Sequence, residues 1–394
     1  MKDVTKLGNI ADIYDGPHAT PKKIENGKYF LSISSLDNGS LDLSKSAFIS
    51  DKDFIKWTKR VQPQKGDLLF SYETRLGEAA LMPDNLQACL GRRMGLLRPK
   101  KDKVIPQYLL FAYLSPEFQK VIRKNTIKGA TVDRIALNEL GNFPIYIPDL
   151  KIQQSIAAVL SALDKKIALN KQINTRLEEM AKTLYDYWFV QFDFPDANGK
   201  PYKSSGGEMV FDETLKREIP KGWEPFKLSE LVTLSTGKED ANFATEQGIY
   251  PFFTCSEKIL KCDVYSFDTQ AILLAGNGAF SVKRFTGKFN AYQRTYVLEP
   301  KSKNLYPIVY FVIIDNVIKF TSGSRGSIIK FITRGDIENI DVVLPNDIEN
   351  MRFSEVLYTC LLQAELLEKQ NHQLTQLRDF LLPMLMNGQV SVAE

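Results

Sequence analysis

The sequence predicts an α/β (α+β) fold in which one design occurs twice. Two similar globular domains are separated by two long helices that form an antiparallel coiled coil, with an internal pseudo-two-fold repeat. Two observations predict this arrangement. The chain repeats itself with an offset of about 200 residues, and each copy ends in almost 40 residues without Gly or Pro. A period this long indicates a duplicated domain and not a solenoid of short repeats.

The composition is that of a globular protein with two or three domains. The chain has 394 residues, 44% of them hydrophobic and 25% charged, which is enough for a separate core in each domain. Four cysteines and two histidines exclude a disulfide scaffold and leave few ligands for a metal. The first residues lack the apolar core of a signal peptide, and the apolar run 308–314 is far shorter than the roughly 20 residues that span a bilayer. We therefore expect a soluble, cytoplasmic protein.

Matching residues define the repeat and the domain limits. Three residues recur 201 positions later: Arg93, Pro99 and Pro106 as Arg294, Pro300 and Pro307. Further on the offset is 197, and residues 129–149 align with 326–346. We therefore expect globular domains over 1–150 and 225–346, long helices over 151–190 and 347–387, a linker over 191–224 and a tail over 388–394.

Each globular domain is expected to mix strands and helices. Short strands with turns come first, represented by YFLSISSL and GDLLFSY in one copy and by GIYPFF, QAILLAG and TYVLEP in the other. Such runs, bounded by Gly, Asn and Asp, are typical of strands. A helical stretch follows, over 105–124 and 305–320, and then a further strand over 143–149 and 340–345.

An apolar seam with spacings of four and three runs through both long helical segments, which indicates a coiled coil. The segment 151–190 carries 6 basic and 4 acidic residues (+2) and the segment 347–387 carries 3 and 6 (−3), so the two favour each other over self-pairing. Asparagines on the seam fix the register, and Arg378 departs from the apolar pattern. The alternative is that each helix packs on its own domain. The predicted seam comprises Ile156, Leu160, Leu163, Ile167, Asn170, Asn174, Leu177, Leu184, Phe353, Leu357, Leu367, Asn371, Leu374 and Leu381.

The order of these segments resembles the specificity subunit of type I restriction-modification enzymes over nearly the whole chain. The resemblance is carried by the opening KLGNIADIYDG, the first helix ending in LYDYWFVQFDFP, and the linker from KPYKSSGGEMV to IPKGW. It implies that the globular domains are target recognition domains, each reading a few base pairs of a split, asymmetric double-stranded DNA target. It also implies that the long helices set the spacer and dock two methyltransferase subunits, which nuclease-translocase subunits join.

Motifs for catalysis are missing from the sequence. There is no Pro-Pro pair, which an amino-methyltransferase motif of the Asn-Pro-Pro-aromatic type would need, and no phosphate-binding GxxxxGK[ST] loop. The GxG of LLAGNGAF (273–280) is interpreted as a turn, and Asp149 as a helix cap. Cys255 and Cys262 lack partners at metal-ligand spacing. We expect a non-catalytic chain without cofactor or metal. Two alternatives remain: a stand-alone DNA-modifying or cleaving enzyme, and a coiled-coil scaffold without a DNA role.

Residues that could contact DNA are sought in loops that combine basic, amide and hydroxyl side chains with glycine, because these groups read base edges and phosphates. Each could equally be a solvated loop residue, and the duplicated Arg93 and Arg294 could make a structural salt bridge. The candidates in the first domain are Lys22, Lys23, Ser34, Ser35, Tyr72, Thr74, Arg75, Arg92, Arg93, Lys128 and Thr131. Those in the second are Lys238, Ser256, Asn277, Lys283, Arg284, Gln293, Arg294, Ser324, Arg325 and Lys330.

The loops GATVDRI and GSRGSII are the preferred phosphate contacts, because small residues beside Lys128 and Arg325 permit close backbone approach. Changing Lys128 or Arg325 to Ala is expected to weaken DNA binding by the assembled complex and to lower its salt dependence, since each lysine or arginine on a phosphate releases counterions. A salt titration of the affinity measures both effects. Unchanged affinity and salt slope in both variants would count against these loops.

Overall fold

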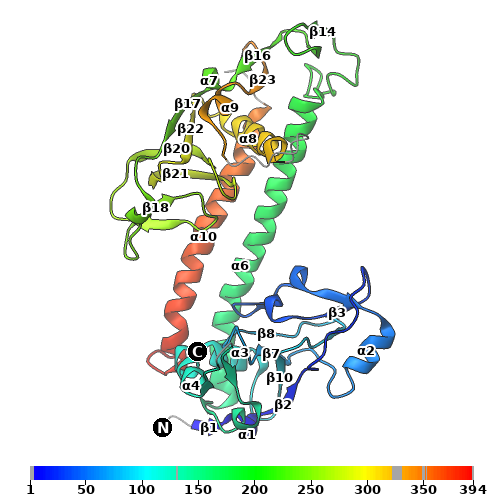
Figure 1. Cartoon of the computed structure of the whole chain (residues 1–394), viewed down its shortest axis with the longest axis vertical. Helices are drawn as coiled ribbons and strands as arrows, with labels where there is room; N and C mark the ends of the chain where they lie inside the picture. Colours follow the sequence, from blue (N-terminus) through cyan, green and yellow to red (C-terminus); the bar gives the residue numbers. More distant parts are fainter. Residues whose placement is uncertain (1–3, 130–131, 322–330, 348–350, 352, 393–394) are drawn as a thin grey trace. The chain divides into compact units, whose positions relative to one another are not determined.

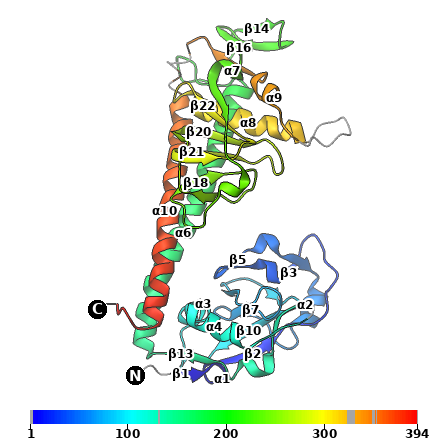
Figure 2. The same cartoon turned by 60° about the vertical axis from the view of Figure 1, so that its left-hand side comes forward.

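The computed structural model describes residues 4–129, 132–321, 331–347, 351 and 353–392 (Figure 1, Figure 2). It divides into two compact units, which are described separately. Unit 1 comprises Met1–Ala168 and Asn371–Glu394, and unit 2 comprises Leu169–Gln370. Within the described residues, no helix combines the length and the apolarity needed to cross a bilayer.

Unit 1 is built on the four-stranded antiparallel sheet β2-β10-β7-β8. Its strands are β1 (Val4–Lys6), β2 (Ala11–Asp15), β3 (Lys28–Phe30), β4 (Leu36–Asp37), β5 (Ser40–Leu41), β6 (Ala47–Ile49), β7 (Leu68–Ser71), β8 (Ala79–Leu81), β9 (Ala88–Cys89), β10 (Met94–Pro99), β11 (Thr126–Ile127), β12 (Arg134–Ile135) and β13 (Pro144–Tyr146). Its shorter helices are α1 (Leu7–Ile10), η1 (Ile33–Ser35), η2 (Leu43–Lys45), α2 (Asp51–Trp57), α3 (Pro106–Leu114), α4 (Pro116–Lys124) and α5 (Leu137–Leu140).

The central strands of unit 1 are apolar on both faces because each face covers a separate core. Leu68 and Phe70 of β7 lie in the core that α3 covers, while Leu69 between them lies in the core on the opposite face. This follows from the alternation of side chains along a strand. Helix α3 is buried from Tyr108 to Tyr113, which explains why its sequence is apolar all round.

Unit 2 repeats this order of strand pairing within the six-stranded sheet β17-β22-β20-β21-β18-β19. Its strands are β14 (Met209–Asp212), β15 (Arg217–Pro220), β16 (Trp223–Lys227), β17 (Val232–Thr236), β18 (Tyr250–Phe253), β19 (Leu260–Cys262), β20 (Phe267–Ala275), β21 (Val282–Ala291), β22 (Thr295–Pro300) and β23 (Asp341–Pro345). Its shorter helices are α7 (Leu228–Leu231), η4 (Ala241–Phe243), α8 (Leu305–Thr321) and α9 (Arg334–Glu338). Even the parallel pair β3–β9 of unit 1 has a counterpart, β18–β21.

The two long helices are α6 (Leu150–Tyr185), followed by the π-helical turn η3 (Asp186–Val190), and α10 (Ser354–Met386). The predicted cap is confirmed, because the Oδ1 atom of Asp149 accepts a hydrogen bond of 2.9 Å from the backbone N–H of Ile152. Helix α10 begins later than predicted. Strand β23 ends at Pro345, and the N–H of the next residue, Asn346, donates to the carbonyl of Gly222.

In unit 1, the first part of α6 contacts the last part of α10. Arg378 forms an ion pair of 3.1 Å with Asp164, and the Asn371 amide donates to the carbonyl of Ile167 at 3.3 Å. The position of Arg378 on an otherwise apolar seam is thus explained by a carboxylate on the facing helix. The core of unit 1 also takes in residues from both helices: Ile156, Ala157, Leu160, Leu385 and Met386.

In unit 2, the rest of α6 contacts the first part of α10. The Asn170 amide donates to Gln370 at 2.6 Å, and the Asn174 amide donates to Glu368 at 3.2 Å. Residue numbers rise along one helix as they fall along the other, so these segments are antiparallel. The strands β20 and β21 lie against α10 in both views (Figure 1, Figure 2), so each helix segment also packs on the domain of its own unit.

None of the predicted seam residues is fully exposed. Buried members are Ile156, Leu160, Ile167, Asn170 and Leu357. Half-buried members are Leu163, Asn174, Leu177, Leu184, Phe353, Leu367, Asn371, Leu374 and Leu381.

The segment 191–224, which the sequence suggested as a linker, is packed as part of unit 2. It contains the hairpin β14–β15 and contributes rings to an aromatic cluster. Phe194 stacks at 4.7 Å on both Tyr202 and Trp223, and Trp223 also meets Phe189 and Phe192. The turn formers in this segment shape tight turns, while its aromatic residues anchor it.

Candidate nucleic-acid interface

A loop corner with the same backbone bonding occurs once in each unit. In unit 1, the N–H of Tyr72 donates to the carbonyl of Arg93 at 3.2 Å, and the N–H of Ile135 donates to the carbonyl of Tyr72 at 2.9 Å. An isolated bridge joins Glu73 to Arg134. We call Tyr72, Glu73, Thr74, Arg93 and Arg134 the unit 1 corner.

Unit 2 builds the same frame from different residues. The N–H of Gly276 donates to the carbonyl of Arg294 at 2.8 Å, the N–H of Ile332 donates to the carbonyl of Gly276 at 2.8 Å, and a bridge joins Asn277 to Phe331. We call these five residues the unit 2 corner. Because the bonding is the same, Gly276, Asn277 and Arg294 are equivalent to Tyr72, Glu73 and Arg93.

The unit 1 corner is closed by an internal ion pair. The Nε atom of Arg93 lies 2.9 Å from a carboxylate oxygen of Glu73, and a guanidinium nitrogen lies 3.4 Å from the hydroxyl of Thr74. The Tyr72 ring is buried, and burial raises its pKa, with smaller contributions from Asp15 and Glu73. For Arg93, the structural salt bridge that the sequence left open is therefore present.

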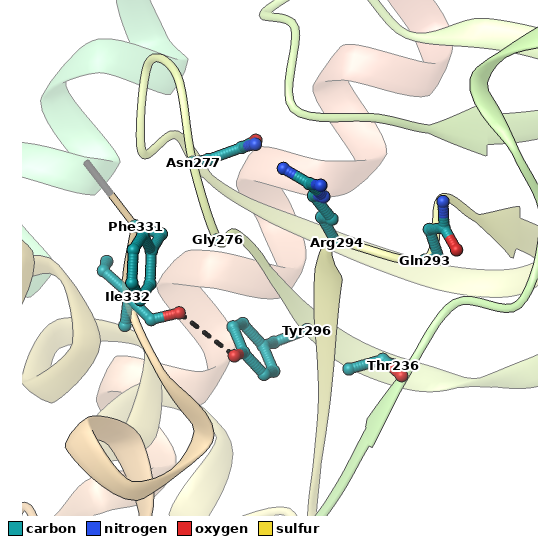
Figure 3. Close-up of a pocket in the computed structure, with 8 residues that line it drawn as sticks. All are labelled: Thr236, Gly276, Asn277, Gln293, Arg294, Tyr296, Phe331 and Ile332. Carbon is teal, nitrogen blue, oxygen red and sulfur yellow. Dashed lines mark hydrogen bonds between the residues drawn. The ribbon is translucent and has the colours of Figure 1, made fainter.

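The unit 2 corner is open. Arg294 and Gln293 are exposed and Asn277 is half-buried, and all three line a depression of about 520 Å³ (Figure 3). Its wall is fixed by a 3.0 Å hydrogen bond from the Tyr296 hydroxyl to the carbonyl of Ile332. Among the residues that the structure describes, no carboxylate forms an ion pair with Arg294. The salt bridge found at Arg93 therefore has no counterpart here.

Of the other unit 2 candidates that the structure describes, all but one lie near this corner. Lys283 donates to the carbonyl of Ser256, and the neighbouring Cys255 thiol lies 3.5 Å from the carbonyl of Arg294. Burial lowers the pKa of Lys283, against smaller opposing effects of Cys255 and Glu257. Lys238 adjoins Glu239, whose carbonyl accepts from the N–H of Gln293 at 2.9 Å.

The exception is Arg284, which faces away from this surface. It follows Lys283 directly on β21, and consecutive residues of a strand point to opposite faces. Its side chain is only 5% exposed, pairs with Glu178 of α6 at 2.5 Å and lies 4.6 Å from the centre of the Tyr310 ring. Burial alone would lower the pKa of Arg284, but the electrostatic effects of Tyr310 and Glu178 raise it. The assignment of Arg284 as a DNA contact does not fit this position.

In unit 1 two further candidates are buried. Tyr72 is 4% exposed, and Ser35 is fully buried with its hydroxyl 2.9 Å from that of Ser46. Ser35 ends the short helix η1, which turns it inward, so neither residue presents its side chain to DNA. Arg75 is bonded internally, to the carbonyl of Ile33 and to Glu78, both at 3.2 Å.

The remaining candidates of unit 1 are open to solvent: Lys22, Lys23, Ser34, Thr74, Arg92 and Lys128. Four candidates lie outside the described residues: Thr131, Ser324, Arg325 and Lys330.

A second basic surface in unit 1 was missed by the sequence analysis. His18, Lys56, Trp57, Lys59 and Arg60 line a depression of about 720 Å³ beside α2. Arg60 pairs with Asp15 at 2.6 Å, and Lys56 lies 5.0 Å from the centre of the Trp57 ring. The signal was present as the run KWTKR, in which three cations flank an aromatic residue. This run contains no glycine, so a criterion based on glycine-containing loops does not find it.

No group of three or more histidine, cysteine, aspartate or glutamate side chains placed to hold a metal ion occurs in the described parts of the chain.

Comparison with known proteins identifies the family. A family model described as the type I restriction modification DNA specificity domain matches residues 1–179 and 220–376, which is most of the chain. The chain belongs to this type I specificity family. Family membership gives it a role in DNA sequence specificity and not in catalysis. The alternatives of a stand-alone modifying or cleaving enzyme and of a scaffold without a DNA role are not favoured.

Individual proteins similar to this chain support the same family assignment. The EcoDI specificity subunit from Escherichia coli is 45% identical over 181 residues, which cover 44% of this chain and 40% of that relative. The chain thus spans less than half of that relative in this match. The MjaIX specificity subunit from Methanocaldococcus jannaschii is 24% identical over 438 residues, which cover all of this chain and 94% of the relative.

A solved structure shares the fold of this type I specificity protein. The type I restriction-modification S subunit from M. genitalium superimposes with a TM-score of 0.64 at 15% identity, covering 98% of this chain and 96% of that one.

Proposed function

We propose that this chain is the DNA-recognition subunit of a type I restriction-modification complex and that it reads a split, asymmetric target. One observation carries the proposal. Both units hold the same corner frame with different side chains, Glu73 and Arg93 in one and Asn277 and Arg294 in the other. Two copies of one recognition design with different polar groups would read two different half-sites. Residues 1–150 and 225–346 would be the target recognition domains.

We further propose that α6 and α10 form an antiparallel coiled coil along the predicted seam, with an internal pseudo-two-fold repeat. The cross-helix bonds of Asn170, Asn174 and Asn371 support this pairing and its register. A helix of 36 residues is about 54 Å long at 1.5 Å per residue. That length exceeds one turn of DNA, about 34 Å, so the helices would act as a spacer between half-sites.

The proposed partners are two methyltransferase subunits and the nuclease-translocase subunits. A docking face on the spacer is supported within unit 2 by apolar side chains that α6 leaves open. Leu169, Ile173 and Met180 are 38–49% exposed, and spacings of four and seven residues place them on one face of the helix. Such a stripe suits a partner helix.

Methylome mapping tests the target. Cells that express this chain with its methyltransferase subunit should carry methylation at a split motif, with a gap on the order of five to eight base pairs given the spacer length. A contiguous motif would contradict the spacer role. Purified alone and incubated with methyl donor, ATP, metal and DNA, the chain should show no turnover, whereas turnover would favour the stand-alone enzyme.

A further inference from the structure

We infer that Arg294 reads a guanine in the major groove, with the Asn277 and Gln293 amides beside it, and that the unit 1 corner lacks this capacity. The inference rests on the proposed function and names the base that one of its sites would take. The two corners share one backbone frame but differ in their side chains.

Hydrogen bonds fix the backbone of Arg294, whereas its side chain is exposed to solvent. Its carbonyl accepts from the N–H of Gly276 at 2.8 Å and from the Cys255 thiol at 3.5 Å. The side chain is exposed and forms no ion pair with a carboxylate of the described residues. The segment 322–330, which precedes Phe331, contains no acidic residue in its sequence. The guanidinium donors of Arg294 are therefore not neutralised by an acid of this corner.

The surroundings of Arg294 favour a base edge over a free ion. Figure 3 shows the Arg294 guanidinium extending toward the Asn277 amide, with Gln293 on the adjoining loop. Arginine matches the N7 and O6 acceptors of guanine with two parallel hydrogen bonds, and asparagine or glutamine matches N7 and N6 of adenine. One arginine flanked by two amides thus suits a guanine followed by a neighbouring base. Lys238 and Lys283 supply positive charge nearby for the phosphates.

Gly276 keeps the corner open. A Cβ atom at this position would lie 2.8 Å from the carbonyl oxygen of Arg294 and 3.0 Å from the Tyr296 ring, closer than side chains tolerate. The equivalent residue of unit 1 is Tyr72, whose ring is buried there. The ring that forms the wall in unit 2 belongs instead to Tyr296, on the adjacent strand.

The unit 1 corner also has an arginine, but the side chain of this arginine is already paired. Glu73, equivalent to Asn277, occupies the Nε side of Arg93 at 2.9 Å. The guanidinium of Arg93 is thus already neutralised by a carboxylate, and a base that binds along its Nε edge would have to displace this carboxylate toward the negative potential of DNA. The two half-sites should therefore differ at this position, with a guanine contact made only by unit 2.

The test uses the full chain assembled with its methyltransferase subunits. In Arg294→Ala, the preference of the complex for one G·C pair in one half-site should fall by about 5- to 150-fold, the range for one bidentate pair. The base preferences in the other half-site should be unchanged. Asn277→Glu installs the carboxylate of unit 1 and should produce the same relaxation. Because both changes remove one interaction, the double variant should be no worse than either single one.

Arg334→Ala is the matched control. It removes another arginine of unit 2 that is exposed and paired with Glu338 at 2.6 Å, and it should leave the methylated motif unchanged. Retention of the full motif at wild-type levels in both Arg294→Ala and Asn277→Glu would overturn the inference.

A chemical probe covers the case in which Arg294→Ala abolishes methylation. Replacing single guanines of the mapped target by 7-deazaguanine removes only the N7 acceptor. At one guanine of the unit 2 half-site this should weaken binding of the wild-type complex about tenfold, the value of one charged hydrogen bond. No effect at any guanine would refute the role of Arg294. If the wild-type methylome shows no sequence motif at all, the proposed function itself fails.

Discussion

Replacing Arg284 by alanine is expected to destabilise unit 2 by about 3 kcal/mol, the lower end for removal of one partner from a buried ion pair. The lower end applies because Glu178 is 40% exposed and keeps part of its hydration. Arg284 also lies near Glu365 and Glu368, so its loss leaves several carboxylates of α6 and α10 close together. Hydrogen exchange resolved by peptide measures the effect, with unit 1 peptides as an internal reference.

The loss of stability in Arg284→Ala should also depend on pH in a defined direction. Glu368 is exposed as a residue, but partial desolvation of its carboxyl group raises its pKa, against the lowering effects of Asn174 and Arg284. Without the arginine the pKa rises further, so the folded state binds more protons than the unfolded state. Stability then falls as pH rises, and the defect should be larger at pH 8 than at pH 5. A defect independent of pH would argue against the electrostatic cause.

Lys283→Ala is the control for Arg284→Ala, because it removes a basic side chain from the opposite face of the same strand, β21. Lys283 precedes Arg284 but lies on the face of the unit 2 corner, so its loss should change stability by less than about 1 kcal/mol. It should instead weaken DNA binding and lower the salt dependence of the complex. If Lys283→Ala destabilised unit 2 while Arg284→Ala did not, the assignment of the two faces would be wrong.

Replacing Trp223 by alanine is expected to cost about 3–5 kcal/mol, the usual range for removal of a buried aromatic side chain. Trp223 is 7% exposed and its ring contacts Phe189, Phe192 and Phe194. It also begins β16, which pairs with β23 from Trp223 opposite Pro345. The hairpin β14–β15 should then exchange its amide hydrogens much faster.

Trp223→Phe is the matched control, because a smaller ring retains part of the stacking. It should recover at least half of the stability lost in Trp223→Ala. Equal protection of the hairpin in the wild type and in Trp223→Ala would show that the aromatic cluster does not anchor this segment.

The long helices and the order of elements were predictable because their signals are regular. Segments free of Gly and Pro locate α6 and most of α10, which contains Pro383 near its end, and Asp149 marks the start of α6. The repeat itself located equivalent strands, since Met94–Pro99 and Thr295–Pro300 differ by the same offset as Arg93 and Arg294. Such patterns can be read from the sequence itself, so they can be found without knowledge of tertiary contacts.

The chemistry of individual candidates was not predictable, because it depends on partners distant in sequence. Arg93 and Arg294 are alike in sequence context, yet Glu73 pairs with the first while Asn277 stands beside the second. Lys283 and Arg284 are adjacent basic residues, and only the pairing of β21 decides which one is buried against Glu178. A single sequence does not reveal which face of the β20–β21 hairpin meets the helices.

Unit 1 is built from two separate segments of the chain, and this affects the order in which the units fold during synthesis. Unit 2 is one continuous stretch, Leu169–Gln370, whereas unit 1 joins Met1–Ala168 to the segment that starts at Asn371. Leu385 and Met386 belong to the core of unit 1, so the part of the chain that the ribosome releases first has to wait for some of the last-made residues. The nascent protein therefore completes its second recognition unit before its first.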